Sequence, residues 1–131
     1  MCGRYTLTAD VQAIQQTFNL EIVSHPIQPR YNIAPSQPVP IIKNDNRHEL
    51  SFVQWGLVPS WAKDPSIGYK MNNARSETVA EKPTFRQAFK RRRCLIPADG
   101  FFEWSKQGKS KVPMYIHLTN RELFAFAGLW E

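Results

Sequence analysis

The chain has 131 residues, of which 42% are hydrophobic and 21% are charged, so it is predicted to fold as one globular domain and not to be disordered. It carries 17 Lys and Arg against 11 Asp and Glu, and the resulting net charge of +6 favours a polyanionic partner, nucleic acid first and an anionic membrane surface second. No apolar run is long enough to cross a bilayer, which excludes a membrane-spanning helix. The two cysteines lack CxxC spacing, which disfavours a zinc site or a disulfide framework.

The chain begins Met1-Cys2-Gly3-Arg4-Tyr5, with a cysteine directly after the initiator methionine. Methionine is removed most readily before a small side chain, so Cys2 is expected to become the N-terminal residue, with no signal peptide ahead of it. It would then carry an α-amine that titrates near ~8 and a thiol that titrates near ~8.5. Because the two groups lie on adjacent carbons, they can close a five-membered ring on an aldehyde carbon. The competing interpretation is that Cys2 is a small buried hydrophobic residue.

The first half of the chain mixes strand, helix and proline-rich patterns. In an extended chain, Cys2 and Arg4 would point to the same side. A helix cap at Thr8 or Asp10 precedes apolar residues at helical spacing, and five prolines in residues 24–40 favour an ordered loop over a flexible linker. In chain order we predict a strand at 2–7, a helix to about residue 19, the loop at 24–40, paired strands at 39–43 and 49–55 around a turn at 44–46, and a loop at 62–70.

The second half is predicted to be rich in β-structure after a single helix. That helix lies within residues 76–92, with Phe85, Ala88 and Phe89 on one face and basic residues at its C-terminal end. Turn residues then separate the strands. The predicted strands are 101–105, 112–118 and 123–130, and the predicted turns are 98–100, 107–110 and 119–122. The chain stops within an apolar strand, so we expect a single domain, residues 1–131, that is incomplete at its C-terminus.

Three groups of residues are candidates for chemistry or binding, and each has a structural alternative. The loop from Asn73 to Thr78 can present donors to phosphate or sugar oxygens, or it can simply cap the next helix. Glu103 lies among aromatic residues that would raise its pKa, or it faces water. Tryptophans can stack on unpaired bases or fill the core, and the basic run 90–93 can follow phosphates or end a helix. The three histidines have no partners close in sequence, and a metal site is not expected.

Six ordered blocks closely resemble the SRAP family, the SOS-response-associated peptidase domain. They span the whole chain, which makes the match far more specific than any one block alone. The blocks are Met1-Cys2-Gly3-Arg4-Tyr5, Arg30-Tyr31-Asn32-Ile33-Ala34-Pro35, Trp55-Gly56-Leu57-Val58-Pro59-Ser60-Trp61, Asn73-Ala74-Arg75-Ser76-Glu77-Thr78, Arg93 to Trp104, and Gly128-Leu129-Trp130-Glu131.

The resemblance implies an α+β fold with a mostly antiparallel, barrel-like β core and two or more flanking helices. It also implies a protein without a cofactor that captures abasic sites in single-stranded DNA covalently, in the cytoplasm or bound to the nucleoid or nuclear DNA. The implied catalytic residues are Cys2, Asn73 and Glu103, and the implied DNA-binding residues are Arg4, Pro35, Trp55, Trp61, Arg75 and Trp104. The family's His-x-Arg-x-Pro motif has no counterpart here, since His117 lies upstream of the expected place.

Three functions therefore compete. The first is capture of an abasic aldehyde by the Cys2 amine and thiol, with formation of a thiazolidine. The second is a thiol peptidase or autoprotease that uses Cys2 as an N-terminal nucleophile. The third is a non-covalent module for single-stranded DNA, which would depend on salt but on neither the lesion nor Cys2. The sequence leaves the oligomeric state open.

Overall fold

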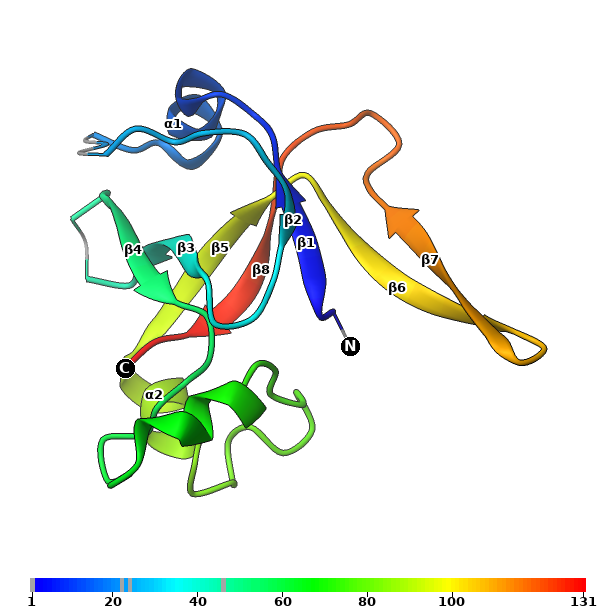
Figure 1. Ribbon diagram of the computed structural model, residues 1–131. Helices are drawn as coiled ribbons and strands as arrows, with labels where there is room; N and C mark the ends of the chain where they lie inside the picture. Colours follow the sequence, from blue (N-terminus) through cyan, green and yellow to red (C-terminus); the bar gives the residue numbers. More distant parts are fainter. Residues whose placement is uncertain (1, 22, 24, 46) are drawn as a thin grey trace.

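The computed structural model describes residues 2–21, 23, 25–45 and 47–131 (Figure 1). Eight strands and three helical segments follow one another along the described chain. They are β1 (Arg4–Leu7), α1 (Val11–Phe18), β2 (Arg30–Ile33), β3 (Pro38–Lys43), β4 (Leu50–Gln54), the 3-10 helix η1 (Pro65–Lys70), α2 (Arg86–Arg91), β5 (Arg93–Ala98), β6 (Gly100–Gln107), β7 (Ser110–Ile116) and β8 (Phe124–Leu129).

The strands form two four-stranded sheets in which the paired neighbours are antiparallel. One sheet has the order β2-β1-β6-β7 and the other β4-β3-β5-β8. A single residue, Asp99, separates β5 from β6, so the chain crosses from one sheet to the other at that point. The predicted α+β class with a mostly antiparallel β core is confirmed. The two sheets surround a shared core, but no hydrogen-bonded pairing among the described strands joins one sheet to the other, so they do not form a closed barrel.

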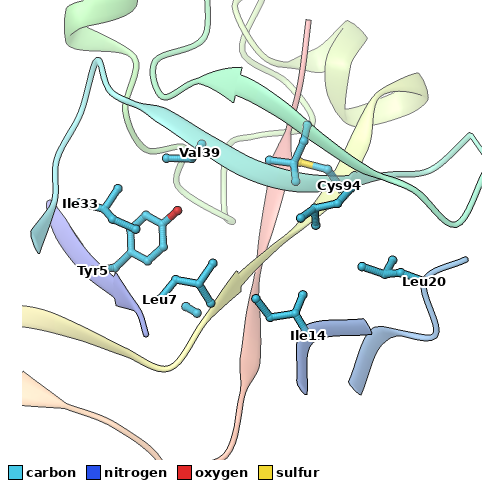
Figure 2. Packing of buried hydrophobic residues seen from close by; sticks show 10 residues of the cluster. Tyr5, Leu7, Ile14, Leu20, Ile33, Val39 and Cys94 are labelled. Carbon is cyan, nitrogen blue, oxygen red and sulfur yellow. The ribbon is translucent and has the colours of Figure 1, made fainter. Parts of the chain in front are cut away.

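The core lies between the two sheets and is covered at one end by α1 (Figures 1 and 2). Each layer contributes aliphatic side chains that are almost wholly removed from water, including Leu7, Ile14, Ile33, Ile41 and Leu50. Burial of such a side chain contributes about 1.5–3 kcal/mol relative to exposure. β1, which carries Tyr5 and Leu7 into this core, is therefore held by packing as well as by pairing.

The helix predicted after Asp10 is confirmed, and its two ends explain its length. The Asp10 carboxylate accepts a hydrogen bond from the Ala13 N–H, which makes Asp10 the cap in preference to Thr8. Asn19 ends the helix in the left-handed conformation that asparagine tolerates. The single wholly buried residue of the helix is Ile14, which joins the core.

Three elements differ from the sequence prediction. β2 lies inside the predicted proline loop, because its four residues pair with β1. Residues 65–70 form a 3-10 helix, which starts at a proline and is capped by Asp64 on the Ser66 N–H. The strand β5 was not predicted, because its pairing depends on β3 and β8, which are distant in sequence. The helix expected within 76–92 is confirmed as α2, which begins only after Pro83, a residue without the N–H that a longer helix would need. The predicted turn at 44–46 includes residue 46, which lies outside the described residues.

The carboxylate of Asp99 fixes the corner between the sheets. It accepts hydrogen bonds from the Thr6 hydroxyl, from the N–H and hydroxyl of Thr8, and from the Ala9 N–H. Burial alone would raise the pKa of Asp99, but these hydrogen bonds outweigh it and lower the pKa below its ordinary value. The ionised carboxylate thus holds the end of β1 and the approach to α1 against the second sheet.

We predict that Asp99→Asn lowers the free energy of unfolding at pH 7 by about 2 kcal/mol, the usual scale for hydrogen bonds to a charged group. Because the folded pKa is depressed, the stabilisation is complete above the unfolded pKa of about 3.9 and is lost as the pH falls through the folded value. Urea denaturation at neutral and acidic pH should therefore show the gap between wild type and variant shrinking in acid. A gap that stays constant, or one matched by the exposed control Glu77→Gln, would contradict this role.

Candidate functional site

Cys2 lies just before β1 and lines a cavity of about 730 Å³. Its side chain is half-buried, and its thiol donates a hydrogen bond to the Arg4 carbonyl at 3.2 Å. The cavity wall includes Tyr5 and Cys94 from the two sheets, and Trp55 and Asn73 from the long connection between β4 and α2. The thiol is therefore accessible from a largely apolar enclosure and not sealed in the core.

Asn73 contacts Cys2 directly. Its side-chain Nδ2 donates a hydrogen bond to the Cys2 carbonyl at 2.8 Å, across 71 positions of sequence. Two hydrogen bonds hold the neighbouring backbone: Trp55 Nε1 donates to the Asn72 carbonyl at 2.8 Å, and the Leu57 N–H donates to the Met71 carbonyl at 3.0 Å. The Trp55 ring also packs edge-on against Tyr5 at 5.5 Å between centroids. Trp55 thus serves as a support for Asn73.

Two glycines allow close backbone contact within the segment that connects β4 to α2. Gly56 has a φ of +132°, and a Cβ there would lie 2.5 Å from the Gly68 carbonyl oxygen. A Cβ on Gly68 would in turn lie 3.1 Å from the Gly56 carbonyl oxygen. The backbones of the β4 exit and of η1 therefore approach more closely than side chains allow. Gly56 lies in one of the six family blocks, whereas Gly68 was not singled out, because its only signal was a glycine in the loop predicted at 62–70.

Glu103 lies on β6, the strand that pairs with β1 next to Cys2. The ladder pairs Arg4 with Phe102 and Tyr5 with Phe101, which brings the next residue of β6 to the start of β1. Burial raises the pKa of the Cys2 thiol, and the negative charge of Glu103 raises it further. The thiol is therefore predominantly protonated at neutral pH. The structure brings together the three residues that were predicted to be catalytic: Cys2, Asn73 and Glu103.

The predicted DNA-binding residues divide into two groups, of which the first lies beside β1. Arg4 and Trp104 line a shallow depression together with Tyr31, and Arg4 NH1 donates to Asn32 Oδ1 at 2.9 Å. The indole of Trp104 is 54% exposed and the Tyr31 ring is 70% exposed. Cys2 and Arg4 were expected on one side only if the chain were extended there, and this condition is not met, because residue 3 is a bend and β1 begins at Arg4. Cys2 lines the cavity, whereas Arg4 lines the depression. Sequence reasoning did not single out Tyr31 as a site residue.

Of the other predicted DNA-binding residues, Trp55 lines the same cavity as Cys2, whereas Pro35, Trp61 and Arg75 do not. Pro35 lies in the turn between β2 and β3, and the next residue, Ser36, donates its N–H to the Trp55 carbonyl at 2.8 Å. Trp61 and Arg75 are exposed, and the Arg75 carbonyl accepts turn hydrogen bonds from Thr78 and Val79. Among the described contacts, hydrogen bonds join Asn73 to Cys2 but join neither Trp61 nor Arg75 to it.

The part of the chain that the structure describes has neither a cluster of metal-binding side chains nor a helix that could cross a membrane. No three His, Cys, Asp or Glu side chains in it lie close enough to hold a metal ion. Its helices are also too short and too polar to cross a membrane.

Comparison with known proteins places this arrangement among named relatives. The family model described as "SOS response associated peptidase (SRAP)" matches residues 1–131. "Abasic site processing protein YoqW" of Bacillus subtilis is 49% identical over 135 residues, which cover 100% of this chain and 60% of that protein. "Abasic site processing protein HMCES" of Xenopus tropicalis is 37% identical over 103 residues, which cover 69% of this chain and 31% of that protein.

A solved structure agrees with the fold. A crystal structure of a protein from Bacteroides thetaiotaomicron superposes with a TM-score of 0.88 at 27% identity, covering 98% of this chain and 61% of that one. The chain thus spans about three fifths of the length of YoqW and of this structure. The arrangement of the two sheets is common to proteins that continue beyond the matched region.

Alkylation of the two cysteines tests the electrostatics of the site. Burial raises the pKa of Cys94 to about 11, and its side chain is almost fully covered, so we predict that iodoacetamide modifies Cys2 first in the native protein. Glu103→Gln removes a charge that raises the Cys2 pKa, so the midpoint of the rate against pH should move to lower pH. Peptide mass spectrometry reads both sites, and Glu122→Gln is the matched control. An unchanged midpoint, or faster labelling of Cys94, would contradict the assignment.

Replacement of Trp55 tests the support beneath Asn73. Trp55→Phe retains an aromatic ring against Tyr5 but removes the donor to the Asn72 carbonyl, so we predict a loss of about 1 kcal/mol in unfolding free energy. Hydrogen exchange of residues 71–73 should also become faster. Trp61→Phe changes an exposed indole and should alter neither measurement. Equal effects of the two substitutions would show that Trp55 does not hold this segment.

Proposed function

This chain belongs to the SRAP family, and on that premise we propose that it captures abasic sites in DNA through a covalent bond to Cys2. The observation that carries the proposal is the contact between Asn73 Nδ2 and the Cys2 carbonyl, beside a cavity and a nearby carboxylate. The printed names of YoqW and HMCES support abasic DNA as the substrate class. The net charge of +6 supports a polyanionic partner.

In the proposed reaction, removal of Met1 leaves Cys2 with a free α-amine. The ring-opened sugar of an abasic site presents an aldehyde, and the neutral amine attacks its carbonyl carbon. The Glu103 carboxylate takes a proton from the attacking nitrogen and passes it to the hydroxyl, which departs as water, and an imine remains. Asn73 holds the Cys2 backbone, so the amine and thiol approach the same carbon from fixed positions.

The thiol then adds to the imine carbon and its proton passes to the imine nitrogen, which closes a thiazolidine ring. No oxidant or reductant is required, and the only molecule lost overall is water. The raised pKa of the Cys2 thiol supports this order of events, because a mainly protonated thiol is a weak first nucleophile. Ring closure removes the free imine, which would otherwise promote strand cleavage. The product is a crosslink and not a nick.

The DNA-binding surface of this proposal extends from Cys2 across Arg4 to Trp104. The Arg4 guanidinium contributes positive charge for a phosphate, and the exposed indole of Trp104 offers a face for an unpaired base. The phosphate contact and the base stacking both suit single-stranded DNA, in which unpaired bases are free to stack on an aromatic ring. Pro35, Trp55, Trp61 and Arg75 complete the proposed surface, with Trp55 acting mainly through its hold on Asn73.

The peptidase hypothesis also uses Cys2 as the nucleophile. The family's description contains the word peptidase, so this alternative competes with capture. A thiol peptidase ordinarily needs an imidazole that takes the thiol proton. None of the three histidines contributes to the cavity wall among the described residues, and the Cys2 pKa is raised where a peptidase would lower it. These observations favour amine-first capture. The non-covalent module remains the alternative that an absence of adduct would support.

Intact-protein mass spectrometry with a single-stranded oligonucleotide that contains one abasic site tests the proposal. We expect an adduct with the mass of the mature chain plus the oligonucleotide minus one water. Cys2→Ala should abolish the stable adduct, whereas Cys2→Ser should leave only an imine that borohydride traps. Glu103→Gln should slow capture about 100-fold, the scale of general acid–base catalysis. The same spectra show whether the mature chain begins at Cys2.

Several outcomes would contradict the mechanism. An undiminished adduct in Cys2→Ala would exclude Cys2, and no adduct with a wild-type chain that begins at Cys2 would exclude covalent capture. Glu122→Gln removes a carboxylate of the same kind away from the site and should react at the wild-type rate. Turnover of a peptide library that is lost in Cys2→Ala would instead support the peptidase.

A further inference from the structure

The outer part of the β6–β7 hairpin stands apart from the rest of the fold. β1 pairs with β6 only at Gly100, Phe101 and Phe102, whereas the pairing of β6 with β7 continues to Gln107 and Ser110. Beyond Phe102 the hairpin is thus a two-stranded ribbon that projects from the body of the molecule (Figure 1). An isolated two-stranded ribbon is marginally stable in water, so a long exposed one calls for an explanation.

The outer part of the ribbon is basic. Beyond Phe102, residues 103–113 hold three Lys and one Glu, and the single acid, Glu103, lies at the base, away from the lysines. Lys106, Lys109 and Lys111 lie at its tip, and all three are exposed. Lys106 and Lys111 are directly opposite each other across the ladder. Like charges in that position repel, and a bound anion relieves the repulsion.

The base of the ribbon is part of the proposed DNA surface. Trp104 lies two residues beyond the last residue of β6 that pairs with β1, and it lines the depression that contains Arg4. About 10 Å of strand separates Trp104 from Gln107 at the tip. A DNA strand that leaves Cys2 over Trp104 would therefore meet the three lysines next, within the reach of neighbouring phosphates.

We propose that the β6–β7 ribbon is a phosphate-binding arm that holds the DNA backbone on one side of the captured lesion. The inference rests on the function proposed above and adds a partner surface to it. The lysines act as point charges on the backbone, so the arm contributes affinity without reading sequence. The proposal predicts that extending the DNA on one side of the lesion increases affinity and capture rate more than extending it on the other side.

The salt dependence of binding tests the arm separately from the covalent chemistry. Fluorescence anisotropy with an undamaged single strand gives the slope of log affinity against log salt. Replacing Lys106, Lys109 and Lys111 together with Gln should reduce that slope by about 2, since each phosphate contact on a single strand contributes about 0.7. The matched control replaces Lys82, Arg86 and Lys90 with Gln, which removes the same charge from the exposed surface around α2.

Capture kinetics then locate the arm relative to the lesion. With protein below saturation, the arm variant should react more slowly only with oligonucleotides that extend on one particular side of the abasic site. Oligonucleotides short on that side should react at the wild-type rate, which also shows that the variant folds and that Cys2 is intact. A wild-type chain without adduct would refute the proposed capture, while the anisotropy would still measure the arm.

Three results would overturn the arm itself. The first is an unchanged salt slope in the lysine variant. The second is an equal loss in the α2 control, which would assign the effect to net charge alone. The third is a loss of capture rate that is the same for both directions of extension. A slope reduced in the lysine variant alone, together with a one-sided loss of rate, would establish the arm.

Discussion

The hydrogen bond from Asn73 to the Cys2 carbonyl is the constraint on which the site depends. Chain termini are ordinarily the least ordered parts of a domain, and a nucleophile placed there needs an external hold. β1 supplies part of that hold, because it lies inside its sheet between β2 and β6. Asn73 supplies the rest from a segment that is remote in sequence. The two together define where the first residues of the chain lie.

Holding Asn73 in place costs folding free energy, because polar atoms near it are buried without hydrogen bonds, and other contacts offset this cost. Asn72 Oδ1 and Thr78 Oγ1, on either side of Asn73, are buried without a hydrogen-bond partner among the described residues, and Tyr5 OH in the cavity wall shares this condition. Each such atom costs about 1–3 kcal/mol. The Trp55 hydrogen bond and the close contact of Gly56 with Gly68 hold the segment despite that cost. Unpaired polar groups of this kind concentrate where function sets the geometry.

The sequence predicted the elements that local patterns determine and missed those that need a distant partner. Asp10 and Asn19 marked the ends of α1 because capping is a local property. β2 could not be read from residues 30–33, since its pairing with β1 depends on a strand more than 20 residues away. In the site, the family resemblance supplied Cys2, Asn73 and Glu103. No spacing rule would have joined positions 2, 73 and 103, because their proximity arises from the pairing of β1 with β6 and the closure of the β4–α2 connection.

The distribution of charge and apolar surface divides the proposed work between two regions. The cavity beside Cys2 is lined mainly by apolar groups, and limiting water there favours an imine over its hydrolysis and keeps the thiol protonated until the amine has reacted. A strongly basic cavity would attract phosphates into the place that the sugar must occupy. Among the described residues that line it, Arg93 is the single Lys or Arg, whereas Arg4 lies in the neighbouring depression and three lysines lie along the ribbon. In the proposed mechanism, attraction of the polyanion and reaction with its aldehyde would therefore occur at separate surfaces joined by Trp104. Substitutions on the cationic surface should therefore leave the reactivity of Cys2 in the cavity unchanged.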